Sequence, residues 1–462
     1  MSDEQTDDRR AGDDVPYAAD RSPVEGLPST LGVPSGARYV VLGFACSMSV
    51  LLYLHRFSLS LVSVPMMNEL GMDEKDLGKA TAWFFYTYAL TQVPAGSLSD
   101  RLGARWTLSL YVVLWSLAIM GMGLIQGVLS LIVCRALLGL AQAGAYPCIA
   151  SVNKRWFPPQ QRGLANSVTT MGGRAGSLLN SLVTVFLMTS IGVWLGWETG
   201  QWRILFLLYG SLGMIWAVLF SSWFRNDPAS HPACNDAEVE LIAPASLEST
   251  PAVAARQPPW LVLLHGVSSP SLYFLCGISI FVNVGWIFLV TFYAVYLEKV
   301  HGWARSDLGI LTAVPLLASM CGGVAGGLMT DALVRRVGLT WGRRLPGIIG
   351  SGGAACAYLA SLLSDDPKIQ IALFAIAGFL IDFGLGALWA VFQDIGGKAV
   401  ASVLGFTNMC GNFAAGVFSE RIGGFAKAGE WPMVFKCSAA ALFVTALCWL
   451  CVNPRRKLTA DD

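Results

Sequence analysis

Charged residues are scarce in this chain. Only 13% of its 462 residues are Asp, Glu, Lys or Arg, and 54% are hydrophobic, whereas soluble domains carry about 25% charged residues. A single core in water stops growing near ~250–300 residues, so it cannot absorb an apolar excess of this size. The composition therefore predicts a polytopic membrane protein whose surroundings are a lipid bilayer.

Motifs typical of enzymes and of metal sites are also missing. The sequence contains no HExxH, no Walker loop and no GxSxG in a suitable context, so we expect neither an enzyme nor a cofactor or metal site. Its eleven cysteines lie scattered, mostly singly inside apolar runs, and are expected to be packing residues. The net charge of +1 argues against a nucleic-acid partner.

Residues 1–38 lack the apolar segment of a signal peptide. They are polar, acidic and rich in Pro and Gly, which predicts a disordered cytoplasmic tail. A second polar stretch, with six prolines between residues 225 and 259, predicts a cytoplasmic linker over 225–268. The last residues, 453–462, are expected to form a second cytoplasmic tail.

Long apolar runs fill the chain between these polar stretches. A membrane-spanning helix needs ~20 mostly apolar residues, and twelve runs are long enough. We predict an all-α membrane protein with twelve transmembrane helices in two pseudo-symmetric six-helix bundles, over 39–224 and 269–452. The expected spans are 39–64, 79–99, 107–126, 128–150, 164–190, 202–224, 270–297, 307–330, 346–363, 369–392, 399–420 and 433–452.

Lys and Arg are unevenly divided between the two sets of loops. With both termini placed in the cytoplasm, the cytoplasmic side holds nineteen of them and the other side nine. Loops rich in Lys and Arg stay on the cytoplasmic side of a membrane. We therefore expect a multi-pass protein of the cell membrane (the inner membrane in a bacterium) with cytoplasmic termini. A monomer is expected as well.

No carboxylate lies inside the predicted spans of the first bundle, yet three arginines lie well away from the span ends: Arg56, Arg135 and Arg174. A charge at this depth is costly unless something stabilises it. Guanidinium binds carboxylate through two parallel hydrogen bonds, so these arginines predict a site for a small organic anion. Snorkelling towards a helix end is the alternative for Arg56, and capping of exposed backbone carbonyls is the alternative for Arg174.

Amide and aromatic side chains are expected to complete the pocket. Amides, an indole and a phenol suit a hydroxyl-rich ligand, such as a sugar acid or a similar hydroxy acid. Packing is an equally good interpretation of the tryptophan and of the second tyrosine in this set. The expected members are Tyr88, Gln92, Gln142, Asn283, Trp286, Tyr293, Asn408 and Asn412.

Two ionisable residues are candidates for proton coupling. Asp382 lies mid-span in the second bundle, and an intramembrane carboxylate indicates function by default; a structural salt bridge or hydrogen bond is the alternative. His55 adjoins Arg56 and has an ordinary pKa near ~6.5. Successive helical residues point ~100° apart, so His55 and Arg56 do not both face the cavity squarely.

One loop motif occurs twice at the same offset. "GSLSDRLGAR" begins at Gly96 and "GLMTDALVRR" at Gly327, each 57 residues after the start of the first span of its bundle. Two related halves joined by a linker predict a transporter built from repeats. The charged residues expected to gate the exchange between its two conformations are Asp100, Arg101, Arg105 and Asp331.

The chain resembles the major facilitator superfamily, and within it the anion:cation symporter branch, which includes hexuronate and galactonate carriers. The first loop motif looks like the signature loop of that family. The resemblance covers roughly residues 39–452 and implies secondary transport by alternating access. It is carried by "WFFYTYALTQVPAGSLSDRLG", "RALLGLAQAGAYP", "KRWFPPQQRGLANS", "GGLMTDALVRR" and "WAVFQDIGGKAVASVLGFTNMCGN".

The resemblance also implies roles for single residues. Members of this branch have anion-binding arginines at positions matching Arg56 and Arg135, a tyrosine matching Tyr88, and an asparagine in the eleventh span. Proton-coupled members have acids where this chain has His55 and Gln142, and Gln142 cannot titrate. Proton symport, exchange and uniport therefore stay open. A non-transporting anion sensor is a further alternative, against which the two intact loop motifs argue.

Overall fold

The computed structural model describes residues 32–196, 200–247, 270–396 and 400–455. Nearly all of these residues are helical, and the described ranges contain no strand. Nine of their segments are long and apolar enough to cross a membrane; one of these, Arg305–Leu363, contains two rods that meet at Gly338. Two further long helices, α2 (Glu74–Leu102) and α15 (Val400–Lys427), run beside them. The described residues thus confirm the predicted fold of twelve membrane-spanning rods.

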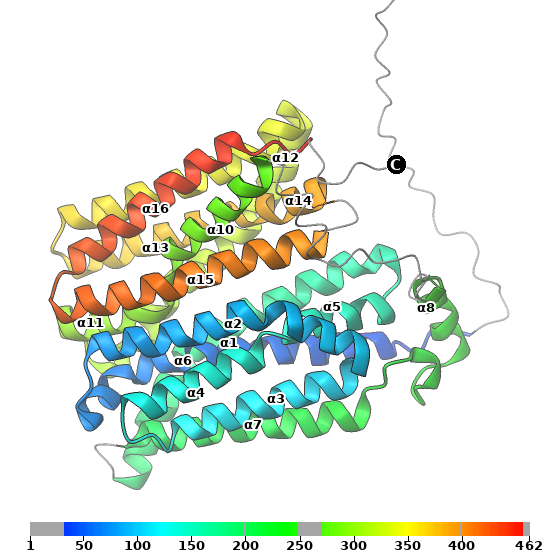
Figure 1. Cartoon of the computed structure of the whole chain (residues 1–462), viewed down its shortest axis with the longest axis horizontal. Helices are drawn as coiled ribbons and strands as arrows, with labels where there is room; N and C mark the ends of the chain where they lie inside the picture. The colour runs from blue at the N-terminus through cyan, green and yellow to red at the C-terminus, as the bar shows by residue number, and fades with distance from the viewer. Residues whose placement is uncertain (1–31, 197–199, 248–269, 397–399, 456–462) are drawn as a thin grey trace, which may run out of the picture.

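The membrane-spanning rods, each a single helix or two consecutive helices, form two bundles that lie side by side (Figure 1). Helices are favoured because a helix satisfies its own backbone hydrogen bonds in lipid. The first bundle consists of α1 (Ala37–Leu70), α2, α3 (Ala104–Met122), α4 (Val128–Gln142), α5 (Ala145–Trp156), α6 (Pro159–Leu195) and α7 (Gln201–Trp223). The second consists of α10 (Pro270–Ile287), the π-helical turn η2 (Phe288–Phe292), α11 (Tyr293–His301), α12 (Arg305–Ala360), η3 (Ser361–Leu363), α13 (Pro367–Phe383), α14 (Leu385–Gly396), α15 and α16 (Trp431–Cys451).

Both copies of the loop motif lead to a glycine with positive φ. Gly103 follows α2 with a φ of 80°, and Gly338 joins the two rods of α12 with a φ of 79°. Glycine adopts such angles without steric cost, so it permits the chain to reverse at both places. The predicted spans left a loop over 331–345, but the structure is helical on both sides of Gly338. The chain therefore turns there within very few residues.

The fourth rod of each bundle is interrupted just after a polar residue. Gln142 lies two residues before Gly144, where α4 gives way to α5. Asp382 lies two residues before Gly384, where α13 gives way to α14. The two-fold repeat of the fold thus puts Gln142 and Asp382 at equivalent positions.

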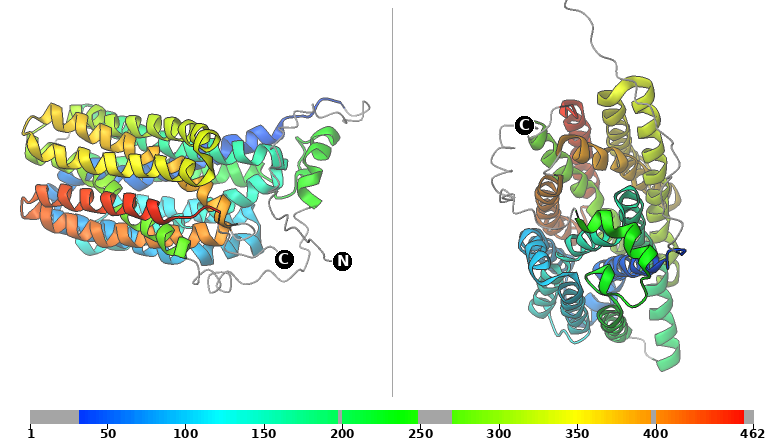
Figure 2. Two further views of the ribbon diagram at one scale, coloured as in Figure 1. Left: turned by 90° about the horizontal axis from the view of Figure 1, so that it is seen from above. Right: turned by 90° about the vertical axis from the view of Figure 1, so that its right-hand side faces the viewer.

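A helix that the sequence analysis did not foresee lies within the predicted linker. This helix, α8 (Asp236–Leu247), follows the short turn η1 (Pro228–Ser230) and lies at one end of the first bundle (Figure 2), called here the α8 end. Glu238 of α8 is fully buried and pairs with the guanidinium of Arg38 at 2.8 Å. It also accepts the backbone N–H of Gly36 at 3.0 Å, so α8 fastens the start of α1. Residues 1–31, 248–269 and 456–462 of the predicted tails and linker lie outside the described ranges.

The two bundles touch closely at the end opposite α8. A Cβ atom at Gly78 of α2 would lie only 2.7 Å from a backbone carbonyl oxygen of α15, so the two helices meet backbone to backbone. Lys299 of α11 pairs with Glu74, and Lys427 of α15 pairs with Asp73 at 2.6 Å. A glycine seam with ion pairs at its edge therefore joins the bundles at this end.

Candidate functional site

Arg56 and Arg135 lie together inside the first bundle. Arg56, in the middle of α1, is 7% exposed, and Arg135 of α4 is 3% exposed. Arg135 Nη1 donates to the backbone oxygen of Arg56 at 3.1 Å. Both guanidinium groups lie over the ring of Phe84, at 5.2 and 4.6 Å from its centroid. Such burial is the opposite of what snorkelling of Arg56 towards a helix end would produce.

Neither of these two arginines has a carboxylate partner among the described residues. Arg56 Nε donates to the side-chain oxygen of Gln142 at 3.1 Å, and the Gln142 amide donates to the backbone of Leu52. Arg56 Nη2 and Arg135 Nε are buried and have no hydrogen-bond partner in the described part of the chain. A buried charge without a counter-charge costs several kcal/mol. The pair therefore has two positive charges and N–H donors that no acceptor among the described residues satisfies.

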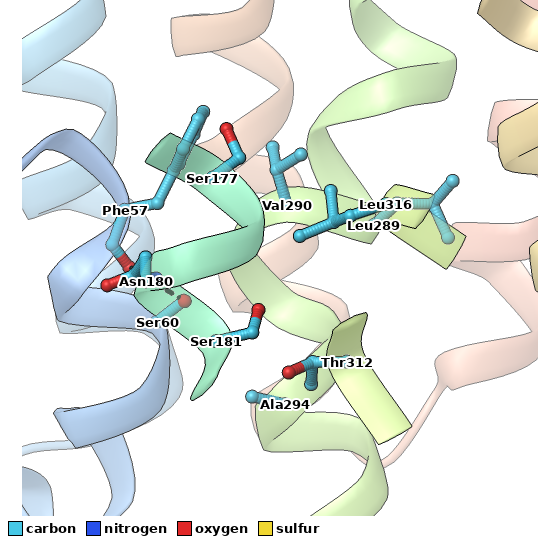
Figure 3. Close-up of a pocket in the computed structure, with 10 residues that line it drawn as sticks. All are labelled: Phe57, Ser60, Ser177, Asn180, Ser181, Leu289, Val290, Ala294, Thr312 and Leu316. Atoms are coloured by element: carbon cyan, nitrogen blue, oxygen red, sulfur yellow. Dashed lines mark hydrogen bonds between the residues drawn. The ribbon is translucent and has the colours of Figure 1, made fainter. Parts of the chain in front are cut away.

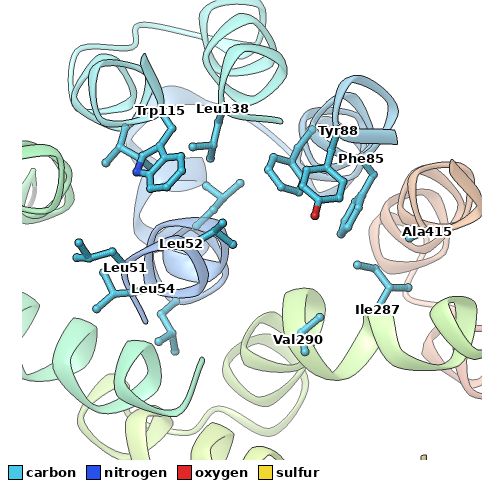
Figure 4. Close-up of a cluster of buried hydrophobic side chains, with 14 of the residues drawn as sticks. Leu51, Leu52, Leu54, Phe85, Tyr88, Trp115, Leu138, Ile287, Val290 and Ala415 are labelled. Atoms are coloured by element: carbon cyan, nitrogen blue, oxygen red, sulfur yellow. The ribbon is translucent and has the colours of Figure 1, made fainter. Parts of the chain in front are cut away.

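Aromatic side chains of α2 form a wall beside the arginines. The Arg56 guanidinium lies 4.5 Å from the ring centroid of Tyr88, and Tyr88 stacks on Phe84. Figure 4 shows Tyr88 and Phe85 directed from α2 towards the second bundle, where Ile287 lies opposite Phe85. The pocket beside the arginines, called here the arginine pocket, is lined by residues of both bundles: Arg56, Phe57, Leu59, Ser60, Phe85, Arg135, Val290 and Thr291.

Arg174 differs from the other two arginines because it is already paired. Its Nη2 lies 2.9 Å from Asp382 Oδ1, which links α6 of the first bundle to α13 of the second. Its guanidinium also lies 5.2 Å from the ring centroid of Trp286, and Ser319 donates to the other carboxylate oxygen of Asp382. The expectation that all three arginines lack a carboxylate partner is therefore wrong for Arg174, because the buried carboxylate of Asp382 is its counter-charge.

Two of the three amides predicted in the second bundle donate hydrogen bonds to their own helices. Asn283 and Asn412 each donate at 2.8 Å to a carbonyl one turn earlier, and Asn408 supplies that carbonyl for Asn412. Tyr293 is 1% exposed and packs in an aromatic cluster that includes Phe374. None of these side chains lines the arginine pocket. In this conformation Tyr293 is a packing residue, as the alternative interpretation had it. Among the described contacts of the amide and aromatic side chains predicted in the second bundle, only that of Trp286 is with an arginine.

The two remaining candidates in the first bundle have different surroundings. His55 is fully buried, and its ring packs against Tyr209 of α7 at 6.0 Å between centroids. It therefore lies inside the first bundle while Arg56 faces the interface. Gln92 lies one turn beyond Tyr88 on α2, and its side-chain oxygen is buried without a partner among the described residues. His55 is thus poorly placed to sense the second bundle.

The predicted gating residues lie at the α8 end. The side chains of Asp100 and Arg101 fall outside the described part of the chain. Arg105 Nε donates to a carbonyl at the end of α7 at 2.8 Å. The Asp331 side chain is 72% exposed and lies 4.0 Å from Arg343, which pairs more closely with Asp394 at 2.9 Å.

Sequence reasoning missed a set of small polar residues on α6 and α12. Asn180, Ser181 and Thr312 line a second pocket between the bundles (Figure 3). The signal was present on α6, where Arg174, Ser177 and Ser181 recur at spacings of three and four residues and so share one helical face. The partner on α12 could not be inferred, because no local pattern brings α6 and α12 together.

Known proteins resemble this chain over nearly its whole length. Residues 45–419 match the model of the Major Facilitator Superfamily. A probable sulfoacetate transporter of Cupriavidus necator is 26% identical over 429 residues, 92% of this chain and 96% of that protein. A D-galactonate transporter of Escherichia coli is 27% identical over 404 residues, 85% of this chain and 89% of that protein.

Solved structures share the fold. A bacterial homologue of the human lysosomal transporter Spinster, in an inward-facing and unoccupied conformation, superposes with a TM-score of 0.69 at 20% identity, covering 90% of this chain and 94% of that one. A D-xylose–proton symporter gives a TM-score of 0.66 at 18% identity, covering 88% and 97%. At these identities the likeness concerns the arrangement of the helices alone.

Proposed function

This chain belongs to the Major Facilitator Superfamily, and from that premise we propose that it is a secondary carrier of a small organic anion working by alternating access. The observation that carries the proposal is the buried pair Arg56 and Arg135, which has free donors and no carboxylate partner among the described residues. One relative is named as a probable sulfoacetate transporter and another as a D-galactonate transporter, and both compounds are organic anions. We propose a sugar acid, a hexuronate or an aldonate, as the substrate class.

An anion relieves the electrostatic cost of the pair. Arg56 and Arg135 lie against one ring, Phe84, in an environment of low dielectric where like charges repel strongly. A carboxylate placed between them offsets one of the two positive charges, attracts both guanidinium groups and accepts two parallel hydrogen bonds. A lysine would keep the charge but lose the planar fork of donors. Binding therefore depends on guanidinium at both positions.

The direction of access follows from the distribution of Lys and Arg. If both termini lie in the cytoplasm of a cell membrane, the α8 end faces the cytoplasm. The glycine seam and its ion pairs, Lys299 with Glu74 and Lys427 with Asp73, then close the outer side. This conformation is inward-facing under that assignment.

Binding measurements on purified protein test the arginine pair. Arg56→Ala and Arg135→Ala should each weaken binding of the hexuronate or aldonate that wild-type protein binds by at least about thirtyfold, because losing one partner of a buried charge pair costs ~2–5 kcal/mol and ~1.4 kcal/mol is tenfold. Arg56→Lys should restore little of it. Arg421→Ala is the matched control, since it removes an exposed arginine of α15, and it should bind normally. Unchanged affinity of Arg56→Ala would overturn the proposal.

Proton coupling, in our proposal, runs through Asp382. The ion pair of Asp382 with Arg174 joins the two bundles, so protonating the carboxylate weakens a contact that must break when the bundles move apart. Asp382 also occupies the repeat position of Gln142, which lies beside Arg56 and cannot titrate. Gln142 favours the second candidate, an exchanger or uniporter without proton coupling.

Uptake into liposomes separates these candidates. An imposed pH gradient should drive accumulation of the substrate by wild-type protein. Asp382→Asn should lose this accumulation and retain only exchange of substrate. If wild-type transport does not respond to the pH gradient, proton coupling is refuted and the protein is an exchanger or a uniporter. Accumulation that survives Asp382→Asn but is lost in His55→Gln would move the proton site to α1.

A further inference from the structure

His231 lies between the end of α7 and the start of α8, outside the membrane-spanning rods. It is buried, at 4% exposed, against the last residues of two rods. The centroid of its ring is 4.3 Å from that of Trp223 of α7 and 5.5 Å from that of Trp156 of α5. The ring therefore attaches the chain that leads into α8 to the first bundle.

The two ring nitrogens of His231 have partners of opposite kind. Nε2 lies 3.0 Å from the backbone oxygen of Trp223, which can only accept, so Nε2 must carry a hydrogen. The backbone N–H of Ala233 donates to Nδ1 at 3.1 Å, so Nδ1 must be without one. The arrangement therefore accommodates the neutral imidazole alone, because a hydrogen on Nδ1 would point at the N–H of Ala233.

The side-chain charge that acts on the ring is positive. Arg225, which follows α7, donates from Nη1 to the same Trp223 oxygen at 3.4 Å. Burial lowers the pKa of His231 from its ordinary value, and the Arg225 charge lowers it further, against the opposing effect of the Trp223 carbonyl. The other titratable side chains in and around this junction have no described contact with the ring; they are Lys154 and Arg155 of α5, Asp227, Cys234, Asp236, Glu238 and Glu240 of the η1 and α8 segment, and Arg38 of α1.

The turn at His231 sets the start of α8, and α8 in turn holds the start of α1. The His231 carbonyl accepts the N–H of Cys234 at 3.0 Å, and the side chain of Asn235 accepts the N–H of Glu238 at 3.0 Å. The Asn235 side chain also binds backbone atoms of the segment before α1, at 2.8 and 3.1 Å. Because Glu238 pairs with Arg38 as well, loss of the ring contacts would loosen both α8 and the start of α1.

We propose that His231 is a pH-sensitive latch: when the solution at the α8 end becomes acidic, the ring takes up a proton from solvent at Nδ1, loses the hydrogen bond from Ala233, and lets α8 detach from α5 and α7. Release leaves Glu238 and Arg38 free to part, so the start of α1 loses its anchor. The latch lies outside the membrane-spanning rods, and its opening needs no substrate.

The pH range of the latch follows from the two states of the ring. In the released form the ring is in water and titrates near its ordinary value of ~6.5, whereas in the closed form its pKa is lower. The released form therefore binds the proton more readily, so the latch is closed above about pH 6.5 and weakens as the pH falls below that value. A single proton shifts the equilibrium by at most about tenfold per pH unit.

Hydrogen exchange of the α8 backbone amides, in the purified full-length protein, measures the latch. From about pH 7.5 to about pH 5.5, exchange corrected for the intrinsic effect of pH should become severalfold faster in wild type, and by no more than about tenfold. His231→Gln keeps a neutral N–H donor for the Trp223 carbonyl and cannot titrate, so its corrected exchange should not change with pH. His301→Gln is the matched control, because His301 of α11 lies at the end opposite α8 with its ring bonded to Gln370 at 2.9 Å; it should respond like wild type.

A ¹⁵N NMR titration of the histidine rings gives a second readout on wild-type protein. The His231 signals are identified by their loss in His231→Gln. At about pH 7.5 the hydrogen should lie on Nε2, and the midpoint of the titration should lie below about 6.5. The same pH range should contain the rise in α8 exchange.

Three results would contradict the latch. One is corrected α8 exchange in wild type that does not depend on pH, and another is an acid response that persists in His231→Gln, since a different group would then release α8. The acid response proposed for Asp382 is intact in that variant, so it cannot be mistaken for the latch. The third is a His231 midpoint at or above about 6.5, or a hydrogen on Nδ1 at neutral pH. If His231→Gln exchanges rapidly at both pH values, the substitution itself has opened α8, and the wild-type midpoint then decides.

Discussion

Replacing Asp382 with Asn should shift the balance between two conformations of the carrier. Asp382 pairs with Arg174 at 2.9 Å across the two bundles, and their side chains are 6% and 22% exposed. The contact exists only while α6 and α13 are close. Its loss should therefore destabilise the conformation described here relative to the one in which these helices have separated.

The size of the shift can be worked from the contact. Removing one partner of a fully buried ion pair costs ~3–5 kcal/mol. Arg174 is partly exposed and keeps its contact with Trp286, and such a contact is worth ~0.5–1 kcal/mol. We therefore expect a net cost of about 2 kcal/mol, which is roughly a thirtyfold change in the equilibrium, since ~1.4 kcal/mol is tenfold.

Distances between spin labels on α5 and α14, at the α8 end, measure this equilibrium. Asp382→Asn should transfer population from the wild-type distance to a second distance, and acidification of wild-type protein should do the same. Asp394→Asn is the matched control: Asp394 pairs with Arg343 at the same 2.9 Å, but both residues belong to the second bundle. A distribution unchanged by Asp382→Asn, or shifted equally by Asp394→Asn, would refute the reasoning.

Three further predictions concern the gate, the packing and α8. Asp100→Asn should slow transport, measured as the rate of single-turnover uptake. The affinity for substrate, measured by equilibrium binding, should stay the same. Gly326→Ala should lower the free energy of unfolding by about 1–3 kcal/mol, because a Cβ there would lie 1.9 Å from the carbonyl oxygen of Phe383; thermal unfolding in detergent measures it. Glu238→Gln should cost about 3 kcal/mol in the same assay, because Arg38 loses its buried counter-charge.

The chain offers matched controls for these changes. Gly327→Ala adds a methyl group where no atom lies within 4 Å, and Glu240→Gln changes an exposed acid of the same helix, α8. Both should unfold like wild type, and equal losses in control and test variants would contradict the packing argument. An affinity for substrate that falls in parallel with turnover would contradict the gating role of Asp100.

The rods could be predicted because the bilayer imposes their length and hydropathy. Their ends could not, because the helices continue past the apolar segment: α6 covers Pro159–Leu195, whereas the apolar run indicated 164–190. Prolines in the linker suggested irregular chain, yet α8 includes Pro244. What stabilises α8 is the buried contact of Glu238 with Arg38, 200 residues away, which no local pattern encodes.

The candidate site divides in the same way. Unpaired arginines in apolar runs indicated an anion, and the structure does bring Arg56 and Arg135 together within the first bundle. The partner of Arg174 is 208 residues away in the other bundle, so its choice of Asp382 depends on how the bundles meet. Sequence can therefore identify which side chains need a partner, but the tertiary contact decides which partner each one takes.

The glycine seam between α2 and α15 has a mechanical consequence. Gly78 and Gly423 face each other with Cα atoms so close that a Cβ on either would lie 3.0 Å from the Cα atom of the other, so at this point the contact is made by backbone atoms. Dispersion at such a surface falls by roughly a quarter to a half once a gap of ~0.5–1 Å opens. The attraction across the glycine seam is therefore short-ranged and weakens soon after the two helices begin to part, so partly opened conformations gain little from it and the bundles should spend little time half open.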